Sequence, residues 1–185
     1  MPRGGANHVR IPECNFCECF AHAWALTTQW GVVLVDPQDA WLLMEYGWAT
    51  LNPKRLSSYA ASTRFGRQNN CSAILHCAIL KVDEKVDHIN GNGLDCRRNN
   101  MRPATQMQNA RNRRAARSST SRFLGVSWKN AQPKHRVKKD GWVAQIRIDG
   151  KTKFLGFFDR EENAALAYNF AAHEHYGEFA RFNHP

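Results

Sequence analysis

Hydrophobic and polar positions alternate along two parts of the chain, and a polar section separates the two parts. Residues 24–35 predict two short strands around a turn, and residues 47–80 predict further strands, of which 73–80 is the most apolar. Between them, Asp36 and Pro37 predict the start of a helix, since Asp can cap a helix and Pro fits its first position. His76 falls in the apolar segment, where we expect a core or supporting histidine rather than a ligand.

The polar middle section is rich in Gly and Asn. Residues 86–89 predict a short strand, residues 90–93 a loop and residues 99–102 a return strand, because Gly and Asn tolerate the positive φ of tight loops. Thr105, with a Gln three residues later, is a capping-box pattern that predicts a helix over residues 105–113. The predicted local order is therefore strand, loop, strand, helix.

The last third of the chain predicts a small sheet packed on a helix. Residues 142–148 alternate in the way typical of a half-buried strand, and an Asp-Gly turn leads into a return strand over 151–158. A further strand over 123–128 makes the predicted sheet three-stranded and antiparallel. Asp159 begins a capping-box pattern for the helix that follows, and Gly177 ends that helix.

Together these elements predict an α+β protein. The predicted divisions are an N-terminal extension over 1–22, an α+β domain over 23–114, and a sheet-and-helix domain over 123–185. Residues 115–122 are small, polar and basic, and they predict a linker.

The formal net charge of +10 over 185 residues changes this picture, because the basic residues are clustered. Two arginines lie at 97–98, four between 111 and 117, and further basic residues between 134 and 139. A cationic surface gains free energy by releasing counterions from a polyanion, so nucleic acid is the expected partner. A solvated basic face is the alternative, but Arg-rich runs broken by Asn, Ser and Thr suit phosphate oxygens better.

No apolar run is long enough for a membrane helix, and the N-terminus has no secretion-signal pattern, so we expect a soluble intracellular protein with free thiols. The closely spaced residues that could form one edge of a zinc site are Cys14, Cys17, Cys19 and His22. A structural zinc site needs a second ligand pair, and Cys71 and Cys77 fit poorly because they lie in strand-like sequence. Zinc is therefore a secondary hypothesis, which metal analysis of the purified protein tests.

Four polar residues of the middle section have a distinctive spacing. Asp87 and His88 end the first predicted strand, Asn100 follows the histidine by twelve residues, and Asn109 lies nine residues further on. In this spacing, the section resembles the HNH nucleases, the ββα-metal class, and in particular their phage homing-endonuclease branch. A polar hairpin would explain the glycines of the loop. It would not explain an acid and a histidine that are adjacent in a strand, with an Asn at each of the two later motif positions.

The resemblance implies a role for each of the four residues. Asp87 and Asn109 would offer hard oxygen ligands to one Mg²⁺ or Mn²⁺ ion. His88 would be the general base that activates water. Asn100 would bond backbone across the loop and hold His88 in place.

Short motifs in the last third, among them Gly125-Val126-Ser127-Trp128 and Phe154-Leu155-Gly156-Phe157-Phe158, resemble the AP2 domain, the DNA-binding module of plant ethylene-response factors. That resemblance implies a sheet that enters the major groove. The residues expected to face DNA there are Ser127, Lys129, Gln145, Arg147, Thr152 and Phe154. The arginines expected to contact DNA elsewhere are Arg97, Arg98, Arg111, Arg113, Arg114 and Arg117. Arg147 would suit guanine edges and phosphate equally.

The favoured function is a metal-dependent endonuclease of the HNH homing type that hydrolyses phosphodiester bonds of double-stranded DNA and is targeted by an AP2-like domain. The alternative is a non-catalytic, sequence-specific DNA-binding regulator with a degenerate HNH domain. An RNA-binding protein fits the charge and gains nothing from the motifs. The favoured function implies a cytoplasmic, nucleoid-associated protein in a bacterial or phage-infected cell, and no oligomeric state is predicted.

Overall fold

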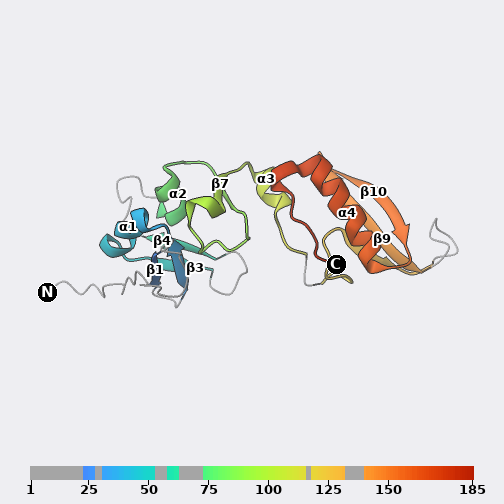
Figure 1. The fold of residues 1–185 in the computed structure, drawn as a ribbon, viewed down its shortest axis with the longest axis horizontal. Coiled ribbons are helices and arrows are strands. Elements are labelled where there is room, and N and C mark those ends of the chain that lie inside the picture. Colours follow the sequence, from blue (N-terminus) through green and yellow to red (C-terminus); the bar gives the residue numbers. More distant parts are fainter. Residues whose placement is uncertain (1–22, 28–30, 53–57, 63–72, 116–117, 132–139) are drawn as a thin grey trace. The chain divides into compact units, whose positions relative to one another are not determined.

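The computed structural model describes residues 23–27, 31–52, 58–62, 73–115, 118–131 and 140–185 (Figure 1). The zinc candidates Cys14, Cys17, Cys19 and His22, like Arg117, lie outside the described residues. The chain forms two compact units, divided between Gln106 and Met107. Its mixture of small sheets and helices confirms the predicted α+β class.

The first unit contains two small antiparallel sheets that precede the polar middle section. The predicted strand pair is confirmed as β1 (Ala23–Leu26) and β2 (Val32–Val35). A three-stranded sheet follows, in the order β3 (Ala49–Leu51), β4 (Tyr59–Ser62) and β5 (Ala73–Ile74).

Two short helices pack with these sheets. Pro37 begins a 3-10 turn that leads into α1 (Ala40–Glu45), so the helix predicted after Asp36 is confirmed, although the Asp36 side chain makes no capping hydrogen bond. The strand predicted over 73–80 is wrong, because β5 ends at Ile74 and α2 (Leu75–Leu80) follows. A continuous apolar run has no clear period, and here the buried Leu75 and Ile79 follow the helical spacing of four.

The core of the first unit joins both helices to the strands of the middle section. Its largest member is Trp48, whose indole Nε1 donates to the Leu42 carbonyl oxygen at 2.8 Å, so the ring is buried without an unsatisfied polar atom. The other core residues include Val33, Val35, Leu43, Leu75, Ile79, Val86, Cys96 and Met101. The Cys96 and Cys77 thiols are free, as predicted.

The middle section has the predicted order of strand, loop, strand and helix. β6 (Val86–His88) pairs antiparallel with β7 (Met101–Pro103), and α3 (Gln106–Arg111) follows. β7 begins later than predicted because residues 98–100 form a 3-10 turn, and α3 is shorter than the predicted 105–113.

The second unit is a three-stranded antiparallel sheet with one long helix, as predicted (Figure 1). The sheet order is β10 (Lys151–Phe158), β9 (Gly141–Ile148) and β8 (Val126–Lys129). The Asp-Gly turn between β9 and β10 has positive φ at both residues, +48° and +78°, which suits the twist of a two-residue hairpin.

The helix α4 (Glu161–Tyr176) covers one face of this sheet. The predicted Asp159 cap is wrong, because Arg160 occupies the N-cap position, whereas Gly177, with φ +55°, ends the helix as predicted. The residues that join helix and sheet are Ala144, Ile146, Ala164, Ala165, Tyr168, Ala171 and Ala172. Small side chains on α4 allow the helix to approach the strands closely, and the predicted core position of Tyr168 is confirmed.

The described part of the predicted linker is tied to the second unit. Ser121 is buried, and its hydroxyl donates to a Glu161 carboxylate oxygen at 2.6 Å. Thr120 accepts a hydrogen bond from the Trp128 backbone N–H at 2.9 Å. Residues 118–122 therefore pack with the sheet and helix instead of extending away from them.

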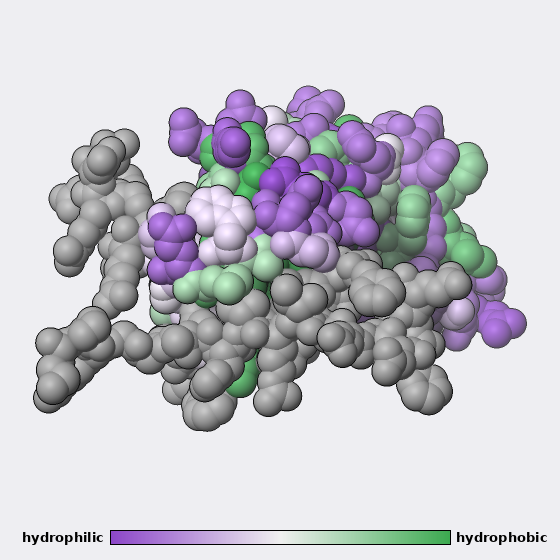
Figure 2. Space-filling view, turned by 60° about the vertical axis from the view of Figure 1, so that its left-hand side comes forward, coloured by the Kyte–Doolittle hydropathy of each residue, from purple (hydrophilic) through white to green (hydrophobic). Residues whose placement is uncertain are grey.

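The described surface is largely hydrophilic in the face shown by Figure 2, with smaller hydrophobic areas among the polar residues. Two of the exposed hydrophobic side chains, Trp41 and Met44, lie on α1. None of the described helices is long and apolar enough to cross a membrane.

Candidate active site

β6 carries Asp87 and His88 side by side, so their side chains project to opposite faces of the strand. Both faces are covered, since Asp87 is 2% exposed and His88 is 5% exposed. The β6–β7 register places Arg102 opposite Asp87 and Met101 opposite His88. The two residues expected to carry the chemistry are thus held in a buried two-stranded ladder.

Arg102 binds the carboxylate expected to hold the metal ion. Its guanidinium Nε and Nη2 donate to Asp87 Oδ2 at 2.9 and 2.7 Å. This contact was missed in the sequence, although the cross-strand register of two predicted strands could have indicated it. Arg102 therefore fixes the direction in which the Asp87 carboxylate points.

His88 lies in a cluster of three aromatic rings from three different elements. The His88 and His76 ring centroids are 5.0 Å apart in an edge-to-face arrangement, and Tyr59 lies 5.3 Å from His76 and 5.8 Å from His88. His76 comes from α2 and Tyr59 from β4. The predicted supporting position of His76 fits this cluster. The position of Tyr59 beside His88 was not predicted from the sequence pattern.

Both histidines of the cluster are held neutral. Burial lowers the pKa of His88 to about 4, although the charges of Asp87 and Asp95 oppose the shift. Burial, followed by the proximity of His88, lowers the pKa of His76 to about 4. A neutral imidazole can accept a proton from water, so His88 is in the protonation state that a general base requires.

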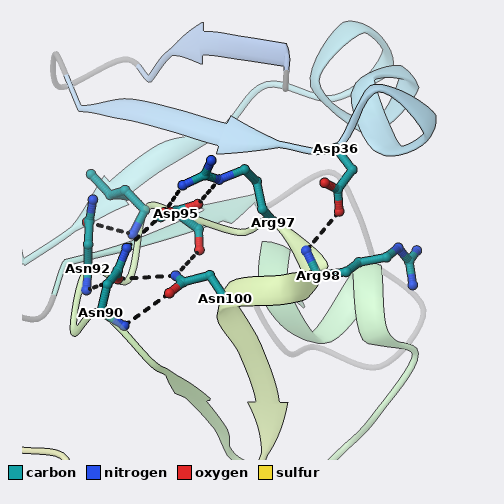
Figure 3. A network of polar contacts seen from close by, with 8 residues as sticks. Asp36, Asn90, Asn92, Asp95, Arg97, Arg98 and Asn100 are labelled. Atoms are coloured by element: carbon teal, nitrogen blue, oxygen red, sulfur yellow. Dashed lines mark hydrogen bonds and ion pairs between the residues drawn. The ribbon is translucent and has the colours of Figure 1, made fainter. Parts of the chain in front are cut away.

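Asn100 joins both ends of the loop between β6 and β7 (Figure 3). Its Oδ1 accepts from the Asn90 backbone N–H at 3.0 Å, and its Nδ2 donates to the Asp95 carbonyl oxygen at 2.8 Å and to Asn90 Oδ1 at 3.1 Å. The Asn100 carbonyl oxygen also accepts from the Ile89 N–H at 2.8 Å. These contacts fix the residue that directly follows His88.

The loop itself is stiffened by side chains that mimic backbone turns. Asn90 Oδ1 accepts from the Asn92 N–H at 2.8 Å, and Asn92 Oδ1 accepts from the Leu94 N–H at 3.1 Å. The loop is also joined to β2, because the backbone of Leu34 exchanges hydrogen bonds with Leu94 and Cys96. Local and long-range bonds together specify one loop conformation.

Asp95 is a buried member of this network that sequence reasoning missed. Its carboxylate accepts from Asn90 Nδ2 at 2.8 Å and from Arg97 Nε and Nη2, each at 2.7 Å (Figure 3). Burial raises the pKa of Asp95, but the hydrogen bonds and charge of Arg97 outweigh burial, so its pKa lies below the usual value. Asp95 therefore remains an anion that orients the loop.

The two arginines at 97–98 already bind carboxylates within the first unit. Arg97 pairs with Asp95, and Arg98 donates through Nε and Nη2 to Asp39 at 2.9 and 2.8 Å. The Arg98 backbone N–H also donates to an Asp36 carboxylate oxygen at 2.8 Å (Figure 3). The contacts of Arg98 fasten the loop to the start of α1, and the DNA contacts predicted for the two arginines stay predictions.

The sheet residues predicted to face DNA share the face of the second unit that points away from α4. The pairing of β9 with β10 sets Arg147 opposite Thr152 and Gln145 opposite Phe154, and all four are exposed. Lys129 is exposed on β8, whereas Ser127 is half-buried. Of the arginines around α3, Arg113 and Arg114 are exposed, and Arg111 lies over the Tyr176 ring.

The predicted metal ligands have the donor chemistry of a site for a hard cation. Asp87 carries a carboxylate and Asn109, half-buried on α3, carries an amide oxygen, and their joint binding of one metal ion stays a prediction. Within the described part of the chain, no group of three or more His, Cys, Asp or Glu residues could hold a metal ion. A carboxylate and an amide suit Mg²⁺ or Mn²⁺, which retain water ligands, better than Zn²⁺.

Comparisons with known proteins place this chain among viral relatives. Protein 3.8 of Escherichia phage T7 is 31% identical over 97 residues, which cover 52% of this chain and 74% of that protein. The chain belongs to the family of Protein 3.8. No family model matches it, and no solved structure gives a significant match.

A second relative of this Protein 3.8 family member has a functional name. A protein of Acanthamoeba polyphaga mimivirus, named as an uncharacterized HNH endonuclease, is 34% identical over 104 residues, or 56% of this chain and 49% of that protein. The chain thus spans about half the length of this relative. The similarity agrees with the HNH resemblance of the middle section, and neither comparison supports the AP2 resemblance.

Acidification is expected to destabilise the first unit of this Protein 3.8 family member between pH 6.5 and about pH 4, partly through His76. The pKa of His76 falls from 6.5 to about 4 on folding, so its contribution to stability is complete above pH 6.5 and is lost as the pH approaches 4. Between these two pH values, the free energy of unfolding should fall by about 1.4 kcal/mol for each pH unit of acidification through His76. Denaturant unfolding across this pH range should show that the free energy of unfolding depends less steeply on pH in His76→Phe than in the wild type. An equally steep pH dependence would contradict the lowered pKa of His76.

Proposed function

We propose that this chain is a metal-dependent DNA endonuclease of the HNH homing type. The observation that carries the proposal is that Asp87 and His88 are adjacent on β6 and that Asn100 fastens the loop that follows them. The similarity to a protein named as an HNH endonuclease supports a nuclease-like function independently of that geometry.

The chemistry follows from what the side chains can donate or accept. Asp87 and Asn109 would hold a divalent cation, which would stabilise the charge on the phosphate and on the leaving oxygen. His88, neutral in its buried cluster, takes a proton from the attacking water through an imidazole nitrogen. Arg102 holds the Asp87 carboxylate in place, and Asn100 holds the backbone beside His88.

In this proposal the second unit delivers the nuclease to double-stranded DNA. The face that carries Gln145, Arg147 and Thr152 lies opposite α4 and is exposed, so a duplex could contact it without disturbing the core. The formal net charge of +10 favours association with a polyanion. An AP2-like targeting role and a nucleoid-associated location in a bacterial or phage-infected cell belong to the same proposal.

Removal of divalent cations tests the catalytic proposal directly. Plasmid nicking or linearisation is expected in Mg²⁺ or Mn²⁺, loss of all cleavage in excess EDTA, and recovery when the metal is restored. Asp87→Asn should need more metal for the same rate, because a carboxylate ligand loses its charge. Cleavage that persists in EDTA would exclude a metal-dependent mechanism.

A second candidate, a non-catalytic DNA-binding regulator, is favoured by one observation. The Asp87 carboxylate that should bind the metal ion is already bound by Arg102 through two nitrogens. The same assay separates the candidates, since a regulator would bind DNA in Mg²⁺ or Mn²⁺ without cutting it.

A further inference from the structure

The second unit contains an open groove between α3 and the hairpin of β9 and β10. Its volume is 480 Å³, within the roughly 300–1,000 Å³ of sites that bind small ligands or parts of larger ones. Figure 1 shows α3 beside the C-terminal end of α4, and Arg111 of α3 and Tyr176 of α4 both line the groove. The polar residues that line the groove include Arg111, Arg113, Gln145, Arg147, Asp149 and Thr152.

The groove brings together arginines that are far apart in the sequence. Arg111 and Arg113 come from α3 and the residues after it, and Arg147 comes from β9. With Asp149 as the only acidic residue of the lining, the formal charge of the groove is three minus one, or +2. A concentration of positive charge on a concave surface favours an anionic ligand.

Tyr176 organises two of these arginines. The Arg111 guanidinium lies over the Tyr176 ring, 4.8 Å from its centroid, so the arginine is held by a cation–π contact. The Tyr176 hydroxyl donates to the Arg147 carbonyl oxygen at 2.6 Å, which ties the same side chain to the β9 backbone. The last turn of α4 thus fixes α3 and the sheet around one opening.

The uncharged lining suits a sugar–phosphate backbone. Thr152 lies opposite Arg147 in the β9–β10 register, and its hydroxyl, like the Gln145 amide, can donate to phosphate oxygens. Met107, Leu124 and the Tyr168 ring add apolar wall. Guanidinium groups beside hydroxyl, amide and apolar surface match a phosphodiester with its sugars better than the edge of one base pair.

We propose that this groove binds the sugar–phosphate backbone of DNA, with Arg111, Arg113 and Arg147 neutralising its phosphates. Arg147 is then a phosphate contact instead of a reader of base edges, and α3 contributes to the DNA grip of the second unit. This inference rests on the proposed function in taking DNA as the ligand. It is separate from the proposed cleavage chemistry.

Salt titration of DNA binding by the full chain tests the groove. In EDTA, the fluorescence anisotropy of two labelled duplexes of equal length and unrelated sequence gives log K against log salt. Arg113→Gln and Arg147→Gln should each weaken both duplexes by the same factor and make the slope shallower by about 1, as phosphate contacts do. Arg111→Lys, which keeps the charge, should retain the wild-type slope of log K against log salt. Arg111→Gln, which removes the charge, should make that slope shallower.

Arg122→Gln is the matched control. Arg122 is exposed in the same unit, stacks on Phe123, and does not line the groove, so it removes one positive charge elsewhere. Thermal unfolding of every variant checks that the unit remains folded.

The outcomes separate the groove from the proposed function. If the groove variants change the slope no more than Arg122→Gln does, the groove inference fails while DNA binding stands. If Arg147→Gln alters only the preference between the duplexes, Arg147 reads bases and the inference is overturned. If the wild-type chain shows no salt-dependent DNA binding, the proposed function and the groove fail together.

Discussion

His88→Ala is expected to abolish cleavage of plasmid DNA in Mg²⁺ or Mn²⁺ and to leave DNA binding intact. Loss of a general base typically costs about 10²–10⁴-fold in rate, which takes a homing-type nuclease below detection in a nicking assay. Binding should survive because the ring is buried against Tyr59 and His76 within the first unit, whereas the exposed sheet face expected to contact DNA belongs to the second. Nicking and gel-shift assays on the same preparations measure both effects.

The control for this experiment is His184→Ala, which removes an exposed histidine of the second unit. It should cleave at the wild-type rate. Because His88→Ala leaves a cavity in an aromatic cluster, thermal unfolding must show that the variant is folded, and added imidazole should restore part of the cleavage. Unchanged cleavage by folded His88→Ala would remove His88 from the mechanism.

The elements that the sequence predicted well are those with a regular period or a distinctive turn. Gln145 is exposed between the buried Ala144 and Ile146, and Arg147 is exposed directly after Ile146, as strand alternation requires; an Asp-Gly pair forms the predicted hairpin turn. The segment over 73–80 has no such period. Its apolar residues fit a buried strand and a buried helix equally, and only the packing of Leu75 and Ile79 in the core decides for α2.

The candidate site shows the same division between local and long-range information. Asp87, His88 and Asn100 could be selected because their spacing along the chain is itself the signal. The arrival of Tyr59 and His76 beside His88 depends on how β4 and α2 pack against β6, which no local pattern encodes. Charge clusters are equally ambiguous, since Arg97 and Arg98 belong to a basic run and yet each forms an ion pair with a carboxylate of its own unit.

Asn100→Ala is expected to lower the free energy of unfolding of the first unit by about 3 kcal/mol, and to slow cleavage as well. Its side chain makes three hydrogen bonds to Asn90 and Asp95, and each contributes on the order of 1 kcal/mol. Without them the backbone at Asn90, two residues after His88, loses its fixed position, so the general base is misplaced even in molecules that remain folded. Denaturant unfolding and nicking rates measure the two effects separately.

The neighbouring residue supplies a matched control. Asn99 is exposed, so Asn99→Ala should change the free energy of unfolding by less than about 0.5 kcal/mol and leave cleavage unaltered. Asn100→Asp keeps the size and the acceptor for the Asn90 N–H but turns two donated bonds into contacts between oxygen atoms, so it should be as damaging as Asn100→Ala. If Asn100→Asp were as stable and active as the wild type, the two donated bonds could not be what holds the loop beside His88.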